Sequence, residues 1–198
     1  MIKVRRGMDL PIAGTPEQTI YDGPAVSQVA LIGSDYHGMK PTMAVRQGDV
    51  VKKGQLLFTD KKNDSAKYVA PAPGTVAAIN RGERRVFQSL VIDVEGHESK
   101  TFAAYKSEQL QELDRQLVTD QLVESGQWVA FRTRPFSKVP SAGSVAASIF
   151  VTAMDTNPLA ADPTVIIGQR EGDFANGLKV LSRLTDGPVN VCAAPDVS

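Results

Sequence analysis

The sequence predicts an α+β protein in which a small all-β domain is followed by an α/β layer. Up to about residue 105, short apolar runs are separated by glycine and proline at a density typical of a small barrel or sandwich. Beyond that point, apolar strands alternate with amphipathic helices, which is the pattern of an open, Rossmann-like α/β sheet. We therefore expect a β domain over residues 1–105 and an α/β domain over residues 106–198.

Short strands joined by tight turns are expected in the first domain. Gly48 and Gly54 lie in polar turns, where glycine adopts a positive φ without steric cost. Pro71 and Gly74 mark a third corner. The expected strands are Val26–Ile32, Met43–Val45, Leu56–Thr59, Tyr68–Ala70, Thr75–Ile79 and Ser89–Val94.

The second domain is expected to open with two short helices after a polar linker, Gly96–Lys106. Ser107 is placed to cap the first helix, whose leucines recur at helical spacing. Thr119 is placed to cap the second, which would end at Gly126. The leucines of the first helix are Leu110, Leu113 and Leu117.

Strands and one longer helix should follow. We expect strands at Ser148–Met154, Thr164–Ile167 and Val189–Cys192, a polar turn at Asp155–Pro163 and a helix at Asp173–Leu184. A doubly wound sheet normally has further strands. We therefore expect residue 198 to fall inside a truncated α/β layer. The apolar face of the longer helix is Phe174, Leu178 and Leu181.

Composition excludes several classes of function. The chain has 22 basic and 22 acidic residues, so it has no global field to attract nucleic acid or an anionic membrane. Four dibasic pairs are expected to be solvated turns: Arg5-Arg6, Lys52-Lys53, Lys61-Lys62 and Arg84-Arg85.

Neither a metal site nor a membrane-spanning segment is expected. The single cysteine, Cys192, excludes an internal disulfide and a cysteine-ligated cluster held by this chain alone, and we expect it to be buried and inert. His37 and His97 are the only histidines and lack metal-ligand spacing. The longest nearly apolar run, Val145–Met154, is about half of what a membrane span requires.

Residues Val45–Val76 resemble the biotinyl/lipoyl carrier pattern. The run VRQGDVVKKGQLLFTDKK is followed by the return APAPGTV, which matches the two glycine turns and the proline-glycine return of these carriers. The resemblance implies a barrel-sandwich hybrid fold. Lys61 and Lys62 stand where carriers have their modified lysine. The return from them to Pro71 is about two residues longer than usual, so we expect both lysines to be unmodified.

Three further segments indicate which family the chain resembles. They are GMDLPIAGTPEQ (Gly7–Gln18), DYHGMKPTM (Asp35–Met43) and VESGQWVAFRTRPF (Val123–Phe136). Together they resemble the A subunit of the sodium-translocating NADH:quinone reductase, whose members are about twice as long. The resemblance covers the whole chain.

The resemblance implies a role in a six-subunit translocase. That enzyme oxidises NADH with NAD as the product, reduces ubiquinone, and drives sodium transport across a bacterial inner membrane. Flavins and iron–sulfur or iron centres belong to other subunits, so no cofactor is expected on this chain. The A subunit lies peripherally on the cytoplasmic face, docks on the B subunit in the membrane, and is associated with quinone.

The second domain also resembles the flavin-binding subunit of respiratory complex I, but its nucleotide loop has changed. Such loops need glycines so that backbone N–H groups can approach phosphates. Here Gly126 is the only glycine between Ser125 and Ala142. We therefore expect the fold without the nucleotide site. Five side chains of this loop are candidates for an interface with another subunit or for the surroundings of the quinone: Trp128, Phe131, Arg132, Arg134 and Phe136.

Simple packing of the aromatics, with solvated arginines, is the alternative for those five residues. Two alternatives stay open for the chain as a whole. The C subunit of an Rnf-type complex would need glycine-rich nucleotide loops and, later, cysteine clusters. A stand-alone lipoyl or biotin carrier would need a modified Lys61 or Lys62.

Overall fold

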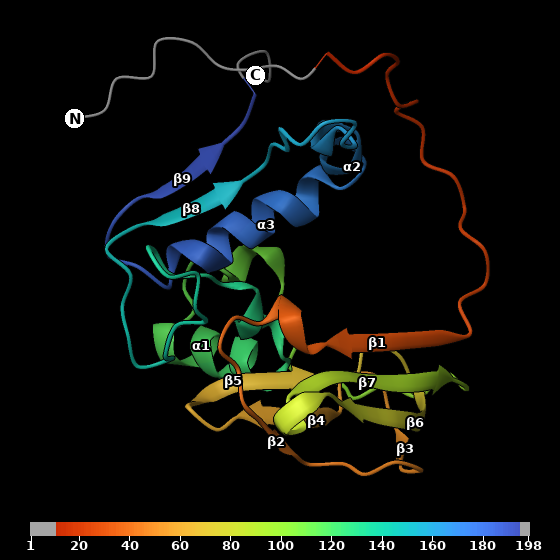
Figure 1. Cartoon of the computed structure of the whole chain (residues 1–198). Coiled ribbons are helices and arrows are strands. Elements are labelled where there is room, and N and C mark those ends of the chain that lie inside the picture. The colour runs from red at the N-terminus through yellow and green to blue at the C-terminus, as the bar shows by residue number, and fades with distance from the viewer. Residues whose placement is uncertain (1–10, 195–198) are drawn as a thin grey trace.

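A computed structural model describes residues 11–194 of the chain. Arg5, Arg6 and residues 7–10 of the Gly7–Gln18 segment lie outside the described residues. In Figure 1 the β half lies below and the α/β half above, and the stretch before the first strand runs from the upper half down to the lower one. The fold is a barrel-sandwich hybrid followed by an α/β domain, as the sequence predicts.

Two antiparallel sheets form the β half. The first has the order β1 (Gln28–Ile32), β7 (Phe87–Val94), β6 (Gly74–Arg81), β3 (Val50–Val51). The second has the order β2 (Pro41–Met43), β4 (Leu56–Asp60), β5 (Asn63–Val69). Two short 3-10 turns join strands of this half, η1 (Gly33–Asp35) and η2 (Glu83–Arg85).

The inner faces of the two sheets share one core. Leu57 and Phe58 of β4 and Leu90 and Ile92 of β7 are completely buried. Tyr68 of β5 stacks on Phe58, with ring centroids 4.6 Å apart. In β5 and β7 a period of two places the buried residues on one inner face, while in β4 a register shift between Leu56 and Phe58 accompanies two consecutive buried residues.

Most predicted strands of this half are confirmed, and two differ in extent. β2 lies two residues earlier than Met43–Val45, because Ala44 already turns to donate its N–H to the carbonyl of Leu57. β5 begins at Asn63, well before the predicted start at Tyr68. Residues 63–67 are mostly polar because one face of the strand is partly exposed, so their sequence does not indicate a strand. Gly48 and Gly54 adopt φ of 91° and 82°, as the turn chemistry predicts.

The first helix of the α/β half differs from the prediction. Ser107 starts only a 3-10 turn, η3 (Ser107–Gln109), and the helix α1 spans Arg115–Glu124. Its cap is Asp114, whose carboxylate accepts the N–H of Gln116 at 2.8 Å. Thr119, the predicted cap of a second helix, is buried inside α1. Gly126 follows the helix with φ of 73° and ends it as expected.

The predicted strand Thr164–Ile167 is wrong, because these residues lie in helix α2 (Pro163–Gln169). Asp162 caps this helix through the N–H of Thr164, and Pro163 occupies its first turn. A short apolar run rich in β-branched residues does not distinguish a strand from a helix by periodicity alone. The capping pair Asp162-Pro163 was the informative signal.

The other elements of this half follow the prediction. β8 (Ile149–Thr152) and β9 (Val189–Cys192) pair in parallel, and α3 (Glu171–Ser182) connects α2 to the approach to β9. A further 3-10 turn, η4 (Gln127–Ala130), follows α1. Buried Val118, Trp128 and Leu184 centre a second core beneath α3.

Candidate functional site at the junction of the two halves

The α/β half is joined to the barrel along strand β5. Helix α1 and turn η4 both pack against this strand. Gly126, between them, lies so close to the barrel that a Cβ at this position would come within 2.6 Å of Val69 Cγ2. The glycine that remains in the loop is therefore required by the contact with Val69 and by its own positive φ.

Trp128 anchors the loop after α1 in the second core. Its side chain is 5% exposed, and its indole N–H donates to the carbonyl of Pro140 at 2.9 Å. Phe131 packs edge-on against it, with centroids 5.1 Å apart. Of the five candidate residues, these two therefore serve mainly to pack the loop, with Phe131 partly exposed.

Polar bonds fasten the same loop to the start of β5. The Asn63 amide donates to the carbonyls of Val139 and Pro140 at 3.1 and 3.0 Å. The Ser65 hydroxyl accepts the N–H of Ala142 at 3.1 Å. These residues were missed in the sequence because nothing local to Asn63 or Ser65 indicates a partner more than 70 positions away.

Arg132 reaches the barrel from the other side of the loop. Its guanidinium lies 5.8 Å from the ring centroid of Tyr36, which in turn packs edge-on against Tyr68 at 4.6 Å. Burial raises the pKa of Tyr68 to about 12, and burial together with the charge of Asp35 raises the pKa of Tyr36. Both phenols therefore stay protonated at neutral pH.

Arg134 and Phe136 project from an exposed turn. The carbonyl of Thr133 accepts the N–H of Ser137 at 2.8 Å, and the N–H of Thr133 donates to the carbonyl of Lys138. Phe136 is 71% exposed, and Arg134 is exposed beside it. The structure thus separates the five candidates into two packed aromatics, one arginine lying over Tyr36, and an exposed pair at the tip.

An open cleft of about 650 Å³ lies along the junction. Tyr36, Tyr68 and Val69 line it from the barrel, and Gly126 and Val129 line it from the α/β half. Its walls combine aromatic rings with a few polar groups, which is the composition of sites that bind flat amphipathic molecules.

Glu124 closes the other side of the junction. Its carboxylate accepts hydrogen bonds from Lys100 and, at 2.7 Å, from Lys67 of β5. These two bonds lower the pKa of Glu124 to about 2. Because Glu124 ends α1 and Lys67 belongs to the barrel, this small network links the two halves.

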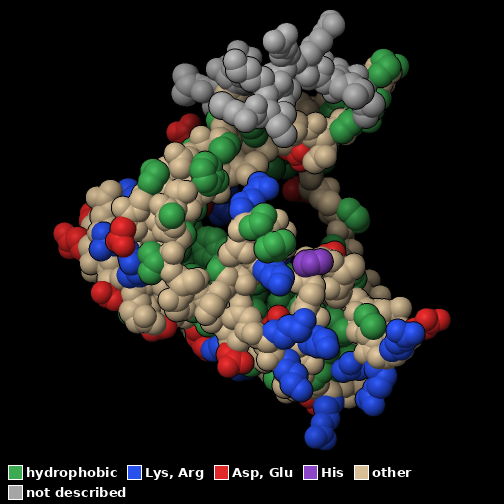
Figure 2. Space-filling view, turned by 60° about the vertical axis from the view of Figure 1, so that its left-hand side comes forward, with side chains coloured by type: hydrophobic (Ala, Val, Ile, Leu, Met, Phe, Trp, Pro, Cys, Tyr) green, Lys and Arg blue, Asp and Glu red, His purple; other side chains and the backbone are tan. Residues whose placement is uncertain are grey.

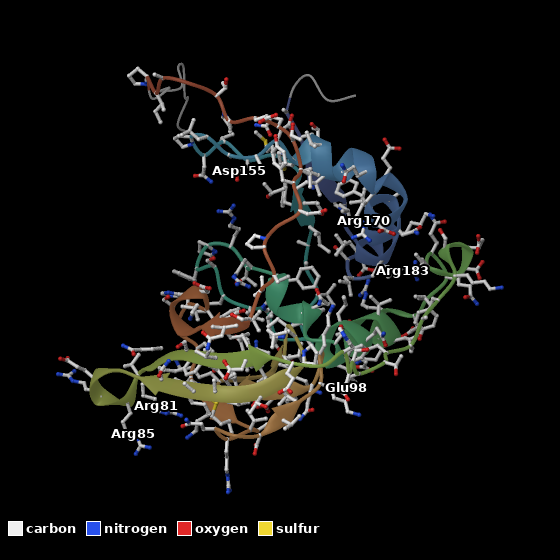
Figure 3. The ribbon with its side chains drawn as sticks, turned by 90° about the vertical axis from the view of Figure 1, so that its right-hand side faces the viewer. Arg81, Arg85, Glu98, Asp155, Arg170 and Arg183 are labelled. Carbon is white, nitrogen blue, oxygen red and sulfur yellow. The ribbon has the colours of Figure 1, made fainter. Side chains whose placement is uncertain are left out.

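The carboxyl ends of β8 and β9 form a second, smaller hollow of about 290 Å³. Nucleotides bind at this edge in open α/β sheets. Beside this hollow the side chain of Gln18 accepts the N–H of Asp162 at 2.7 Å. Asp155, labelled in Figure 3, accepts the N–H of Asn157, so its carboxylate forms a capped turn as expected.

The other chemically reactive residues are not brought together. His37 lies exposed in the turn after η1, and Cys192 is only half-buried, less than expected. Among residues 11–194, no group of three or more His, Cys, Asp or Glu side chains is placed to hold a metal ion. No helix of that range is long and apolar enough to cross a bilayer.

The hairpin that carries Lys61 and Lys62 is tighter than predicted. β4 ends at Asp60 and β5 begins at Asn63, so the two lysines form a two-residue tip. The residues of the longer return therefore lie in strand β5 and do not widen the tip. Lys62 is held down, because its ammonium donates to the carbonyl of Gly38 at 3.0 Å. The absence of modification stays a prediction.

Two family models match consecutive parts of the chain. One, described as the NqrA N-terminal barrel-sandwich hybrid domain, matches residues 2–95. The other, described as the NqrA second alpha/beta domain, matches residues 113–198. The order and the approximate extents of the two matches agree with the architecture above.

Curated relatives resemble the chain over its whole length. The A subunit of the Na(+)-translocating NADH-quinone reductase from Teredinibacter turnerae is 63% identical over 198 residues, and that from Saccharophagus degradans is 62% identical. The protein of the same name from Haemophilus influenzae is 60% identical over 197 residues. These matches cover 99–100% of the chain and 44% of each relative.

Proposed function

The chain belongs to the NqrA family, and from this premise we propose that it serves within a sodium-translocating NADH:ubiquinone reductase as one of its subunits. The observation that carries the proposal is the 63% identity that extends across all 198 residues. The chain spans 44% of the length of such relatives, so the activity, the substrates and the partners of the whole enzyme are part of the proposal. Neither an Rnf-type subunit nor a carrier is favoured.

The role proposed for this chain is structural and quinone-associated. It holds no flavin or nucleotide, and the redox centres belong to other subunits. Two observations support this. The loop that would approach a phosphate is packed by Trp128 and by the Gly126–Val69 contact, and Gln18 occupies the N–H of Asp162 beside the hollow at the end of β8. We also propose the domain boundary near residues 105 and 106.

The exposed pair Arg134 and Phe136 is proposed to contact the B subunit in the membrane, close to ubiquinone. An exposed aromatic beside an arginine is a frequent anchor of protein interfaces. Trp128, Phe131 and Arg132 position this pair by fixing the base of the loop on the core and on Tyr36. The chain would then lie peripherally on the cytoplasmic face of the bacterial inner membrane.

Co-purification tests the proposal. A tagged chain, extended as in its full-length relatives, should recover the other pump subunits and sodium-stimulated NADH:ubiquinone reductase activity from membranes of the source cell. Phe136→Ala should reduce this recovery by about tenfold, because anchors of this kind contribute about 1–2 kcal/mol. The matched control is Phe150→Ala, since Phe150 is 67% exposed on β8. Failure of the unchanged protein to recover any of the pump subunits would refute the proposal.

A further inference from the structure

Two hairpins of the barrel turn at the same end of the molecule. The β4–β5 hairpin turns at Lys61-Lys62 and the β6–β7 hairpin turns at Glu83–Val86. The segment Ala70–Gly74 connects the two hairpins, because it joins the end of β5 to the start of β6. The rings of Phe58 and Phe87, which lie just inside the two tips, pack 5.2 Å apart. Two of the dibasic pairs, more than 20 residues apart in the sequence, thus stand at the tips of hairpins whose inner aromatic residues touch.

This arrangement gathers six cations into what we call the basic end. Lys40 lies beside the β4–β5 tip, because its carbonyl accepts the N–H of Lys61 at 2.8 Å. Figure 2 shows Lys and Arg side chains grouped along the lower edge of the barrel, and Figure 3 shows Arg81 and Arg85 together at one end. The basic end consists of Lys40, Lys61, Lys62, Arg81, Arg84 and Arg85, all exposed.

The charge of the basic end is only partly offset by nearby carboxylates. No ion pair among the described residues includes any of the six cations. The carboxylate of Asp60 is instead occupied by the backbone N–H groups of Lys40 and Lys62, at 3.1 and 3.0 Å. Glu83, Asp35 and Asp64 are the other nearby carboxylates in sequence, and the cations stay in excess.

The β6–β7 tip has an unusual backbone for its residues. Arg84 and Arg85 adopt φ of 52° and 62°, the left-handed region in which glycine or asparagine is ordinarily found. Val86, next to them, is 63% exposed. Positive φ at both central positions belongs to a two-residue hairpin turn, which the N–H of Val86 closes by donating to the carbonyl of Glu83 at 3.1 Å. At this tip the side chains present two guanidinium groups beside an apolar residue.

We propose that the basic end binds the anionic headgroups of a phospholipid bilayer. Two hairpin tips at one end can touch a flat surface together, with guanidinium and ammonium groups on phosphates and Val86 at the apolar boundary. Nucleic acid fits less well, because the basic end carries no exposed aromatic side chain for base stacking. The proposal adds a lipid contact to the protein contacts described above and does not depend on them.

Vesicle co-sedimentation tests this surface with the chain alone. The chain should bind vesicles of mixed phosphatidylglycerol and phosphatidylcholine, fail to bind phosphatidylcholine vesicles, and be released by high salt. The variant Arg84→Asn/Arg85→Asn removes two charges, and asparagine tolerates the left-handed backbone. It should bind about 30-fold more weakly, because each cation contributes about 1 kcal/mol at an anionic surface.

A matched variant separates the basic end from charge in general. Lys52→Gln/Lys53→Gln removes two exposed cations from the opposite end of the barrel and should change the affinity less than about twofold. Equal losses in both double variants would overturn the proposal, as would absent binding to anionic vesicles. A third result would also overturn the proposal: the chain binds vesicles weakly, but Arg84 and Arg85 are required for it to recover an acidic protein. The basic end would then be a site for a protein partner. Recovery of the pump subunits by a chain that binds no vesicles would leave only the proposed function standing.

Discussion

Glu124 provides the main charged contact between the two halves of the chain. Its folded-state pKa of about 2 lies below the ordinary value of 4.5, because Lys100 and Lys67 donate to its carboxylate. Because the pKa is lowered on folding, the ionised carboxylate stabilises the fold fully above about pH 4.5. This stabilisation is lost as the pH falls through about 2. The residue is thus a pH-dependent link between α1 and the barrel.

Replacing Glu124 by glutamine should lower the free energy of unfolding by about 0.5–1 kcal/mol at pH 7, since the carboxylate is about half exposed. The difference from the unchanged protein should shrink between pH 4.5 and pH 2. Urea unfolding followed at several pH values measures it. Glu112→Gln, at an exposed glutamate outside the ion pairs of the described residues, should show no such trend. A difference that persists at pH 2 would contradict the assignment.

Gly126 allows a close approach that no other residue permits. Gly126→Ala should destabilise the chain by about 2–4 kcal/mol, from the positive φ and from the contact of the new Cβ with Val69. Adding Val69→Ala should recover part of the loss, so the two changes should be non-additive in thermal or urea unfolding. Gly143→Ala has open space and an ordinary φ and serves as the control. Strict additivity would show that the contact with Val69 does not matter.

At the scale of elements, β5 is the strand on which the molecule is organised. Its inner face supplies Tyr68 to the barrel core, and its outer residues hold the loop of the α/β half. The outer positions of β5 do not face solvent only, because the side chains of Asn63 and Ser65 bond to the α/β half. This explains why its first half has no strand-like pattern in the sequence.

Asn63→Ala should lower the free energy of unfolding by about 1–2 kcal/mol, because two partly buried carbonyls lose their donor. It should also speed amide exchange at Ala142, whose N–H donates to the neighbouring Ser65. Asp64→Ala, at the next and exposed position, should have little effect on either quantity. An unchanged exchange rate at Ala142 would show that Asn63 does not fasten the loop.

At the scale of the whole molecule, the two halves differ in how completely their apolar surfaces are covered. Leu57, Phe58, Val76, Leu90 and Ile92 of the barrel are fully buried. In the α/β half, Phe150 and Val191 of the β8–β9 pair are 67% and 44% exposed. Local stability follows buried apolar contact, so it should be higher in the barrel.

Hydrogen exchange should therefore give high protection in β4 to β7 and clearly lower protection in β8, α2 and β9. Backbone amides exchange through local openings whose free energy reflects the packing around them. The measurement requires only the isolated chain at neutral pH. Equal protection in both halves would mean that the α/β half is stabilised as well as the barrel is.

The chain should bind neither flavin nor NADH. Trp128 is the only tryptophan and lies in the altered loop, so its fluorescence reports directly on that site. Titration with FMN or NADH at micromolar concentrations should cause no saturable quenching, because packing fills the space that phosphates would need. Saturable quenching of the Trp128 fluorescence by FMN or NADH would contradict the prediction and place a nucleotide near this loop.

The sequence by itself determined the order of elements in the barrel, the glycine turns and the family. These depend on local chemistry, such as the positive φ of Gly48 and Gly54 or alternation along a strand, and on an extended pattern of matched residues. The pairing of Asn63 with the Pro140 segment and the contact of Phe58 with Phe87 between the two basic hairpins could not be obtained in this way. Only the tertiary structure decided them, because they depend on how two sheets close and on contacts between residues far apart along the chain. The same physical reason divided the five candidate residues: their spacing placed them in one loop, but only packing against Tyr36, Pro140 and Val69 decided which are buried and which remain free to meet a partner.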